Sequence, residues 1–210
     1  MKNLLLGTAL VLAPCAASAQ EVTISGGVAI ATSYDLTAKS GAEAEYPLSF
    51  YMQAEKNGFY GQLWFGLLPA ASAPDQVEMD VVLGWSGEVS PGLELGVAYA
   101  AYFLDDSGYD TSELIGSLTY ALSDKLSTTL EVAYDIEAEE TDTSLGLDYA
   151  LTSKWALHGL VGRETATPST YYEVGVTYAV TEEVSLNVLF EDDDTAGNKG
   201  ALTFTMAYDF

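Results

Sequence analysis

Positive charge is scarce in this sequence. Only 7 of its 210 residues are Lys or Arg, against 31 Asp or Glu, and the formal net charge at pH 7 is −24. Proteins that bind nucleic acid neutralise phosphates with clustered basic side chains, so this balance argues against a nucleic-acid partner. Charged residues nonetheless make up only 18% of the chain, and 49% of it is apolar. We therefore do not expect a disordered protein.

Long apolar runs are also missing, apart from a short one at the N-terminus. Lys2, the apolar stretch 4–14 and the small residues 17–19 have the order of a secretory signal. We predict a signal peptide over residues 1–19 and a single exported domain over residues 20–210.

Cysteine and histidine occur once each, as Cys15 and His158. Cleavage of the signal removes Cys15, so we expect no disulfide in the mature chain. A tight zinc site is not expected from one histidine. An alternative interpretation makes Cys15 the lipidated residue of a lipoprotein signal, although Pro14 directly precedes it.

Apolar and polar residues alternate with a period of two from residue 22 almost to the end, which is the pattern of β-strands. Each run is close to the roughly 9–11 residues that cross a bilayer as a tilted strand. We predict an all-β fold, a transmembrane antiparallel up-and-down β-barrel of about twelve strands. The predicted strands are 22–34, 45–55, 59–68, 76–88, 92–104, 112–122, 126–136, 143–151, 154–163, 170–180, 183–191 and 200–210.

Short and longer connections alternate between these strands. This layout is typical of outer-membrane barrels with short periplasmic turns and longer external loops, which here are acidic. The predicted tight turns are at 56–58, 90–91, 123–124, 152–153 and 181–182, and the longer links at 35–44, 69–75, 105–111, 137–142, 164–169 and 192–199.

The two faces of the predicted strands differ in size and polarity. One face carries large apolar residues almost without interruption, too many to fit inside a twelve-stranded barrel, so we expect it to contact lipid. The other face is mostly small or polar and faces the lumen. A soluble sandwich or lipocalin-like barrel is the alternative, but Lys is missing from these strands, whereas a soluble surface normally mixes Lys with its acids.

Aromatic residues cluster on the outward face near the strand ends, where an amphipathic ring is favoured at a membrane interface. The girdle predicted near the tight turns is Trp85, Tyr120, Tyr149, Tyr178 and Tyr208, and the second, near the loops, is Tyr34, Phe65, Phe103, Tyr134, Tyr172 and Phe190. The final outward stripe, Met206, Tyr208 and Phe210, is similar to the C-terminal signal that barrel-assembly machinery is expected to read.

Acidic residues dominate the charged positions of the inward face. The predicted lumen acids are Glu55, Glu78, Asp80, Glu94, Glu131, Asp135, Asp148, Glu173 and Asp209, and the only basic candidate is Arg163 at the rim. A wall of one charge sign concentrates counter-ions, so a continuous channel would favour cations. Asp80 and Glu131 lie nearest mid-strand and are predicted at the tightest section. In the alternative, these acids only solvate a narrow or plugged barrel, which the inward Tyr51, Tyr60, Trp64, Tyr102 and Tyr171 could close.

His158 is the one candidate for catalysis. Its predicted neighbour across the turn is Asp148, and such a pair could orient a general base. Outer-membrane lipid hydrolases carry a serine two residues along the strand from the histidine, where this chain has Leu160 and Ala156. We therefore predict no catalytic residue, and His158 is interpreted as a lumen residue.

The acidic runs 191–194 and 137–142 are hard-oxygen clusters that attract calcium or magnesium. The spacing after Asp192 departs from a calcium loop at Ala196 and Thr203. We expect solvated loop tips or loose divalent binding next to lipopolysaccharide, and no dedicated metal or other cofactor.

Five segments of the first half of the sequence form a recognisable set: Ser25-Gly26-Gly27-Val28-Ala29, Ala31-Thr32-Ser33-Tyr34, Asn57-Gly58-Phe59-Tyr60-Gly61-Gln62-Leu63-Trp64, Val77-Glu78-Met79-Asp80 and Gly84-Trp85-Ser86-Gly87. In these segments the sequence resembles the TorF family, small outer-membrane barrels of proteobacteria described as porins. The resemblance covers residues 22–104 well and the second half only as a generic barrel. The basic segment usual in that family after the opening Tyr reads Leu36-Thr37-Ala38-Lys39-Ser40 here. The resemblance implies transport and no catalytic residues.

The sequence thus predicts a porin of the Gram-negative outer membrane, a narrow acid-lined passive channel for small solutes or ions with cation preference. A non-conducting barrel for surface interaction or envelope integrity is the alternative, and a lipid hydrolase is third. The expected partners are outer-membrane lipid, lipopolysaccharide, the assembly machinery and the solute, with the solute and the oligomeric state left open.

Overall fold

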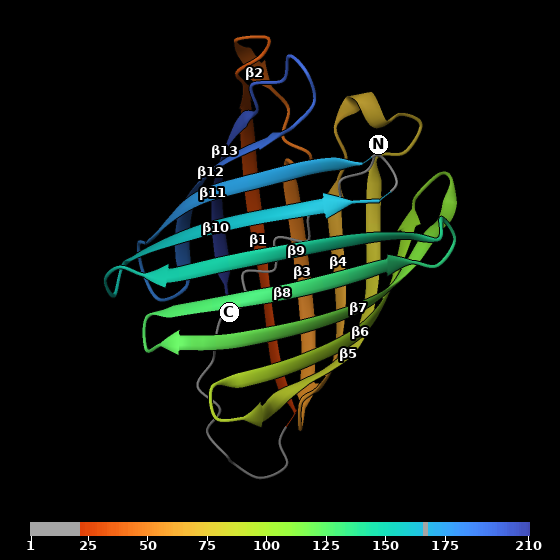
Figure 1. Ribbon diagram of the computed structural model, residues 1–210. Helices are drawn as coiled ribbons and strands as arrows, with labels where there is room; N and C mark the ends of the chain where they lie inside the picture. Colours follow the sequence, from red (N-terminus) through yellow and green to blue (C-terminus); the bar gives the residue numbers. More distant parts are fainter. Residues whose placement is uncertain (1–21, 166–167) are drawn as a thin grey trace.

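A computed structural model describes residues 22–165 and 168–210, and the predicted signal peptide lies outside these residues. The described chain forms one antiparallel sheet that closes into a barrel where β13 pairs with β1 (Figure 1). Its strands are β1 (Thr23–Asp35), β2 (Ser40–Ala42), β3 (Leu48–Lys56), β4 (Phe59–Leu67), β5 (Val77–Ser90), β6 (Leu93–Leu104), β7 (Gly108–Ser123), β8 (Leu126–Asp135), β9 (Glu140–Ala150), β10 (Trp155–Glu164), β11 (Ser169–Ala179), β12 (Val184–Asp193) and β13 (Ala201–Asp209).

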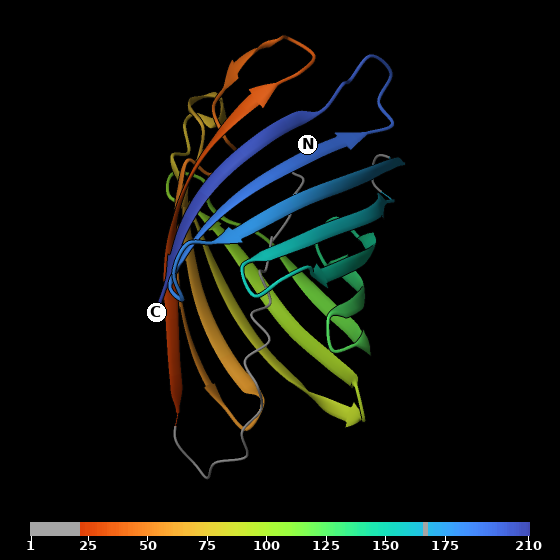
Figure 2. The same cartoon turned by 90° about the vertical axis from the view of Figure 1, so that its left-hand side faces the viewer.

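The twelve predicted strands are confirmed, and the three-residue β2 is an addition to them. Each long strand pairs with its neighbours in sequence, so every connection is a local hairpin apart from the closing pair. Strands on opposite walls cross at a large angle in Figures 1 and 2, as expected where strands tilt to close a barrel. Among the described residues, no helix is long and apolar enough to cross a membrane.

The chain leaves the wall between β2 and β3. Ser33 of β1 pairs with Ala42 and Ile30 pairs with Leu48, so the five residues 43–47 stand opposite only two residues of β1. Pro47 has no N–H to donate to the ladder, and its carbonyl accepts a hydrogen bond from Ala31 N–H at 3.0 Å. The strand predicted to start at residue 45 therefore starts three residues later, and the surplus forms an infolded segment, residues 43–47.

Two of the predicted longer links are short. The β6–β7 connection is 105–107 and the β8–β9 connection is 136–139, since β7 and β9 both start earlier than predicted. Gly108 and Glu139 both have positive φ, of 82° and 58°, which permits such tight turns. The longer connections are those over 36–47, over 68–76, which includes the 3₁₀ helix η1 (Ala70–Ser72), and over 194–200. The first and last of these rise side by side at one end of the barrel (Figure 2), joined by a hydrogen bond from Lys199 N–H to Thr37 Oγ1.

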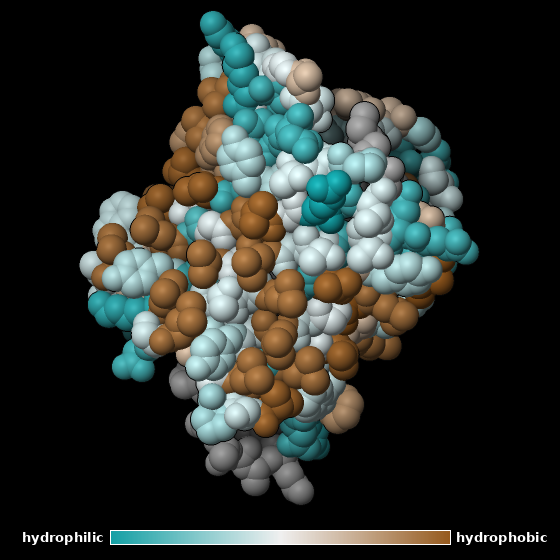
Figure 3. Space-filling view, viewed as in Figure 1, coloured by the Kyte–Doolittle hydropathy of each residue, from teal (hydrophilic) through white to brown (hydrophobic). Residues whose placement is uncertain are grey.

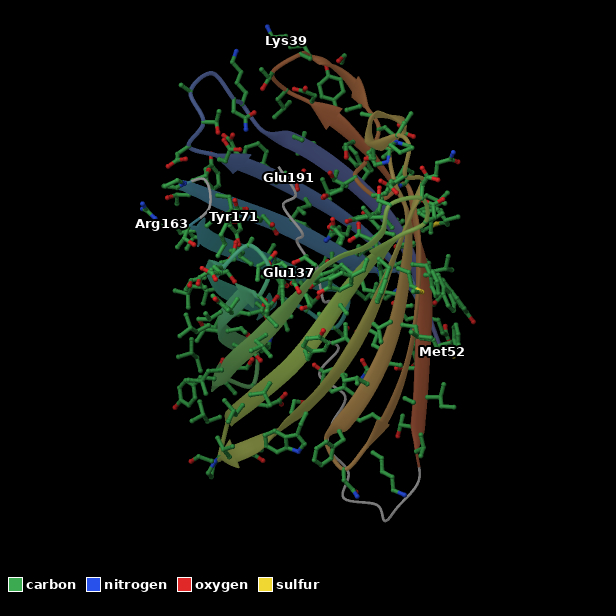
Figure 4. All side chains as sticks on the ribbon, turned by 90° about the vertical axis from the view of Figure 1, so that its right-hand side faces the viewer. Lys39, Met52, Glu137, Arg163, Tyr171 and Glu191 are labelled. Carbon is green, nitrogen blue, oxygen red and sulfur yellow. The ribbon has the colours of Figure 1, made fainter. Side chains whose placement is uncertain are left out.

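The outer surface is apolar. Large aliphatic and aromatic side chains on the outward face of the strands are exposed, and many of them gather on the face seen in Figure 3. Met52 projects outward from β3 (Figure 4). The five aromatics predicted as a girdle all stand on this outward face towards the tight-turn end of their strands. Their placement at a membrane interface stays a prediction.

Candidate functional site

The lumen gathers carboxylates from most of the long strands. Asp80, Glu131 and Glu173 have their side chains on the inward face, because they share the parity of inward partners in the register. Glu191 and Tyr171 point into the barrel in Figure 4. The predicted acids that the register places on this face are Glu55, Glu78, Asp80, Glu94, Glu131, Asp135, Asp148, Glu173 and Asp209.

The basic residues lie elsewhere. Arg163 pairs with Thr143 and Thr170 on the parity of the outward Val161, and its side chain projects away from the barrel (Figure 4). The expectation that Arg163 reaches the rim of the lumen is therefore wrong, because the side chain lies on the outward face of β10. Lys39 is at the tip of the β1–β2 hairpin (Figure 4). Within residues 22–165 and 168–210, no Lys or Arg lies on the inward face of a strand.

Four acids of the lumen were not among the predicted site residues. Glu113 lies between Asp80 and Glu131 and is close enough to repel both, and strand parity could have identified it. Asp142 was assigned to a loop cluster but belongs to β9. Glu191 was grouped with the loop acids although it ends a predicted strand, and it belongs to β12. The fourth, Glu45, lies on the infolded segment, where the pattern of a strand gives no guide.

Tyrosine hydroxyls hold several of these carboxylates. Tyr102 donates to Glu113 at 2.7 Å, Tyr171 to Asp142 at 2.9 Å and Tyr51 to Asp209 at 3.0 Å. A carboxylate that accepts such a bond has a fixed position without a basic partner. The inward tyrosines thus orient the acids and leave their negative charge in place.

The inward aromatic rings lie along the wall above glycines. A Cβ added at Gly162 would meet the Tyr171 ring, and one added at Gly84 would meet the Tyr60 ring. The same holds for Gly27 under Tyr51 and for Gly66 under Trp64. These rings therefore use the space that a side chain at the glycine would take, and they lie against the wall.

The infolded segment adds a second layer over β4 and β5. Tyr46 packs edge-on against Trp64, with ring centroids 4.7 Å apart, and its hydroxyl donates to Glu78 at 2.8 Å. Burial of Tyr46 and the charge of Glu78 raise the pKa of Tyr46, which therefore stays a neutral donor. Glu45 lies next to Glu191 and Glu78; partial desolvation and repulsion by these two raise the pKa of Glu45 to about 7.

One side of the lumen is closely packed. Val82, Ala100 and Tyr102 form a buried cluster, with Tyr60 and Ile115 packed against it. Asp80 is only 2% exposed, and it faces Trp64 on one side and Tyr102 on the other. The inward face of β4–β7 is hereafter called the packed wall. Side chains on this wall pack closely around its carboxylates, and the predicted polar lining did not include this packing.

His158 lies on the opposite side of the lumen. Its Nδ1 is 3.0 Å from Asp148 Oδ1, and its Nε2 is 3.9 Å from Glu173 Oε2. The pair with Asp148 is the one that strand parity predicts. A serine hydrolase needs a hydroxyl at the second nitrogen, and that nitrogen faces a carboxylate instead.

The acidic runs near the loops do not converge. Glu191 points inward, whereas Asp192 accepts from the outward Tyr172 at 2.9 Å, since successive residues of a strand face opposite sides. Hydrogen bonds from the Tyr109 hydroxyl, the Ser112 N–H and Thr111 lower the pKa of Glu137 to about 2. In the described part of the chain, no three Asp, Glu, His or Cys side chains are arranged to hold a metal ion.

Solved structures with the same fold are porin-type barrels. The chain is similar to the KdgM porin (TM-score 0.68, 10% identity, 88% of this chain and 99% of that chain), to the NanC porin (TM-score 0.60, 9% identity, 87% and 98%) and to the CymD monoaromatic hydrocarbon channel (TM-score 0.54, 9% identity, 89% and 87%). No protein-family model and no curated protein matches the sequence. The TorF resemblance stays a prediction, and the fold is that of a porin-type outer-membrane barrel.

Proposed function

We propose that this protein is an outer-membrane porin, a narrow passive channel for small solutes or ions that prefers cations. The observation that carries the proposal is the charge of the lumen. Carboxylates line it on strands from β5 to β13, and the described Lys and Arg residues lie at the turns, at the loops or on the outer face. In a low-dielectric barrel such a lining raises the local concentration of cations.

The width of the barrel supports small solutes. Eight strands leave an interior about filled by side chains and sixteen leave an open aqueous channel, so twelve strands fall between these cases. The aromatic rings above glycines lie against the wall, whereas the buried cluster of the packed wall narrows the lumen from one side.

The charge of this lumen argues against an anionic solute. A structural neighbour is the KdgM porin in complex with oligogalacturonate, a carboxylated sugar chain (TM-score 0.63, 8% identity). A polyanion would be repelled by carboxylates without basic partners. This chain shares the fold of the KdgM porin, but the solutes proposed for it are cations, opposite in charge to oligogalacturonate.

Planar-bilayer recording from refolded residues 20–210 in a potassium chloride gradient tests the proposal. We expect discrete conductance steps with a cation-selective reversal potential. Steps with an anion-selective potential would reject the cation preference and leave the porin in place. A detergent gel of unheated and heated samples checks that the protein is folded, since the mobility of a folded barrel changes only after heating.

A second candidate function is a non-conducting barrel that serves surface interaction or envelope integrity. The packed wall favours it, because Tyr102, Val82 and the infolded residue Tyr46 fill part of the cross-section. Silence in the bilayer, from protein that is folded by circular dichroism, would support this function and reject the channel.

Export is part of the same proposal. A signal peptide over residues 1–19 would be removed on secretion, and the outward stripe that ends at Phe210 would guide assembly beside lipid and lipopolysaccharide. Phe210 pairs with Gly26 by two backbone hydrogen bonds at the barrel closure. N-terminal sequencing of protein from isolated outer membranes tests the cleavage, and any start other than Gln20 would reject it.

A further inference from the structure

Two carboxylates in the lumen are buried with an oxygen atom that has no partner. Asp80 is 2% exposed and Glu173 is 7% exposed, and neither Asp80 Oδ1 nor Glu173 Oε1 receives a hydrogen bond. Buried polar atoms in folded proteins are nearly always paired, and a charge is costly to bury alone. No described Lys or Arg reaches either group. Each of these two oxygen atoms is therefore available to accept a hydrogen bond from a bound ligand.

The surroundings of Asp80 suit an organic cation. Asp80 stands between Trp64 and Tyr102 in the register, and Glu78 is two residues along the same strand. Tyr46 extends this aromatic surface by packing against Trp64. Ammonium groups bind favourably next to aromatic rings, most of all where a carboxylate supplies the opposite charge.

A second acidic centre lies on the other wall. Glu173 of β11 is directly opposite Glu191 of β12, and like charges in such a cross-strand pair destabilise a sheet. Within the described chain, only His158 offers a basic atom here, with Nε2 3.9 Å from Glu173. A bound cation between Glu173 and Glu191 would remove the repulsion.

Glu45 joins the two centres. It lies on the infolded segment, near enough for its charge to act on Glu78 of one centre and on Glu191 of the other. The carboxylates thus form a band that crosses from one wall of the lumen to the other. This band is defined as Glu45, Glu78, Asp80, Glu173 and Glu191.

The spacing of the band selects against a bare metal ion. Calcium needs 6–8 oxygen atoms around one point, whereas no three acidic side chains in the described residues are arranged to hold a metal. An extended ligand with separate positive charges fits better, because each charge can reach a different carboxylate while the apolar links between them contact the rings.

We propose that the carboxylate band binds linear aliphatic diamines and polyamines through their ammonium groups. The inference deepens the proposed function, since it names the cation class that the same lumen would select. Asp80 and Glu78 take one ammonium group beside Trp64, Glu173 and Glu191 take another, and Glu45 bridges them.

Calorimetric titration of the folded, detergent-solubilised protein with spermidine tests the binding without any need for conduction. We expect saturable binding, and we expect Mg²⁺ at matched ionic strength to compete weakly. The variant Asp80→Asn with Glu173→Gln should weaken spermidine binding by about tenfold or more, since it removes two charged hydrogen-bond acceptors. Glu45 lies outside the strands, and Glu45→Gln should weaken spermidine binding to a smaller extent.

A matched control removes two exposed loop charges, Glu139→Gln with Asp194→Asn, and should leave the affinity unchanged. Equal loss in both double variants would mean diffuse attraction to an acidic protein, which overturns the proposal. Absent spermidine binding in a cation-selective channel would overturn it too, and would leave the proposed function intact. Binding by a barrel that is silent in the bilayer would reject the channel and keep the site.

Discussion

The two walls of the lumen are built differently. On the packed wall, Asp80, Val82, Ala100 and Tyr102 are all buried. On the inward face of β8–β12, hereafter the open wall, only Tyr171 and Glu173 are buried among the described residues other than glycine. Both walls carry Asp and Glu side chains. The walls differ in how closely other side chains pack around these carboxylates.

This difference separates two roles for a carboxylate. On the packed wall Asp80 is buried, whereas on the open wall Glu131 is half-buried and Asp148 is exposed. Mobile cations contact accessible charges more readily than buried ones. We infer that a passing ion follows the open wall, and matched variants of the two walls can test that division.

The largest expected effect is on stability. Tyr102→Ala removes a buried ring from the packed wall and leaves Glu113 without its donor, so the free energy of unfolding should fall by about 3–5 kcal/mol. Leu160→Ala, on the open wall, should cost about 1 kcal/mol because the side chain is only half-buried. Urea titration of unfolding in detergent micelles measures both. Equal losses would remove the distinction between the walls.

The second prediction narrows the open wall from within. In Gly162→Ala the new Cβ occupies the place of the Tyr171 ring, which must swing into the lumen and release Asp142. We expect a clear drop in single-channel conductance and a loss of about 1–3 kcal/mol in stability. Gly146→Ala is the control, because this glycine also faces inward but its Cβ would meet nothing closer than 3.9 Å. A conductance that stays at the wild-type level in Gly162→Ala would mean that Tyr171 does not border the ion path.

The third prediction compares one acid from each wall. Glu131→Gln should lower the cation-over-anion permeability ratio by about fivefold, since one charge at ~4 Å in water contributes about 1 kcal/mol. Asp80→Asn should lower the ratio less if ions follow the open wall. Reversal potentials in a potassium chloride gradient measure both, and Glu55→Gln at the turn end controls for charge alone. A larger effect at Asp80 would place the path beside the packed wall.

Sequence periodicity predicted most of the fold because the alternation along a barrel strand indicates which side chains face inward. The inward residues of β4 and β5 follow from parity, and the register places Trp64 and Asp80 on the inward face that the alternation predicts. The same rule applied to Glu113, which was overlooked. Parity fails where the chain leaves the ladder, and Glu45 and Tyr46 reach the lumen only through the surplus residues of the infolded segment.

Packing between strands was the other gap in the prediction. The register runs without a shift from Val161 to Arg163, so alternation alone places Arg163 on the outward face, and its assignment to the rim of the lumen did not follow from parity. The flat placement of Tyr60 and Tyr171 depends on a glycine in the neighbouring strand, and the register that aligns Gly84 and Gly162 with them comes from the structure.

The fourth prediction concerns pH and the infolded segment. The pKa of Glu45 is raised to about 7, above the value of about 4.3 expected for an unfolded chain. The folded state therefore binds more protons between these values, and the contribution of Glu45 to stability falls as the pH rises from about 4.3 to about 7. Cation preference should increase as Glu45 ionises in the folded protein, which occurs around pH 7. Reversal potentials at several pH values measure this change, which Glu45→Gln should flatten; an identical pH profile in that variant would contradict it.

The smallest effect is expected at Glu137, outside the lumen beside the packed wall. Its pKa is lowered to about 2 by bonds from Tyr109, Ser112 and Thr111, so its contribution to stability is present above about pH 4.3 and is lost as the pH falls through about 2. Glu137→Gln should lower the urea midpoint slightly at neutral pH, and the difference from wild type should vanish in acid. Glu139→Gln changes the same residue type in the same turn and should do neither. Glu137 is exposed at the rim, whereas Glu45 stands in the lumen. If the stability differences of Glu137→Gln and Glu45→Gln from wild type change with pH in opposite directions, the position of a carboxylate inside or outside the barrel determines the direction of its pKa shift.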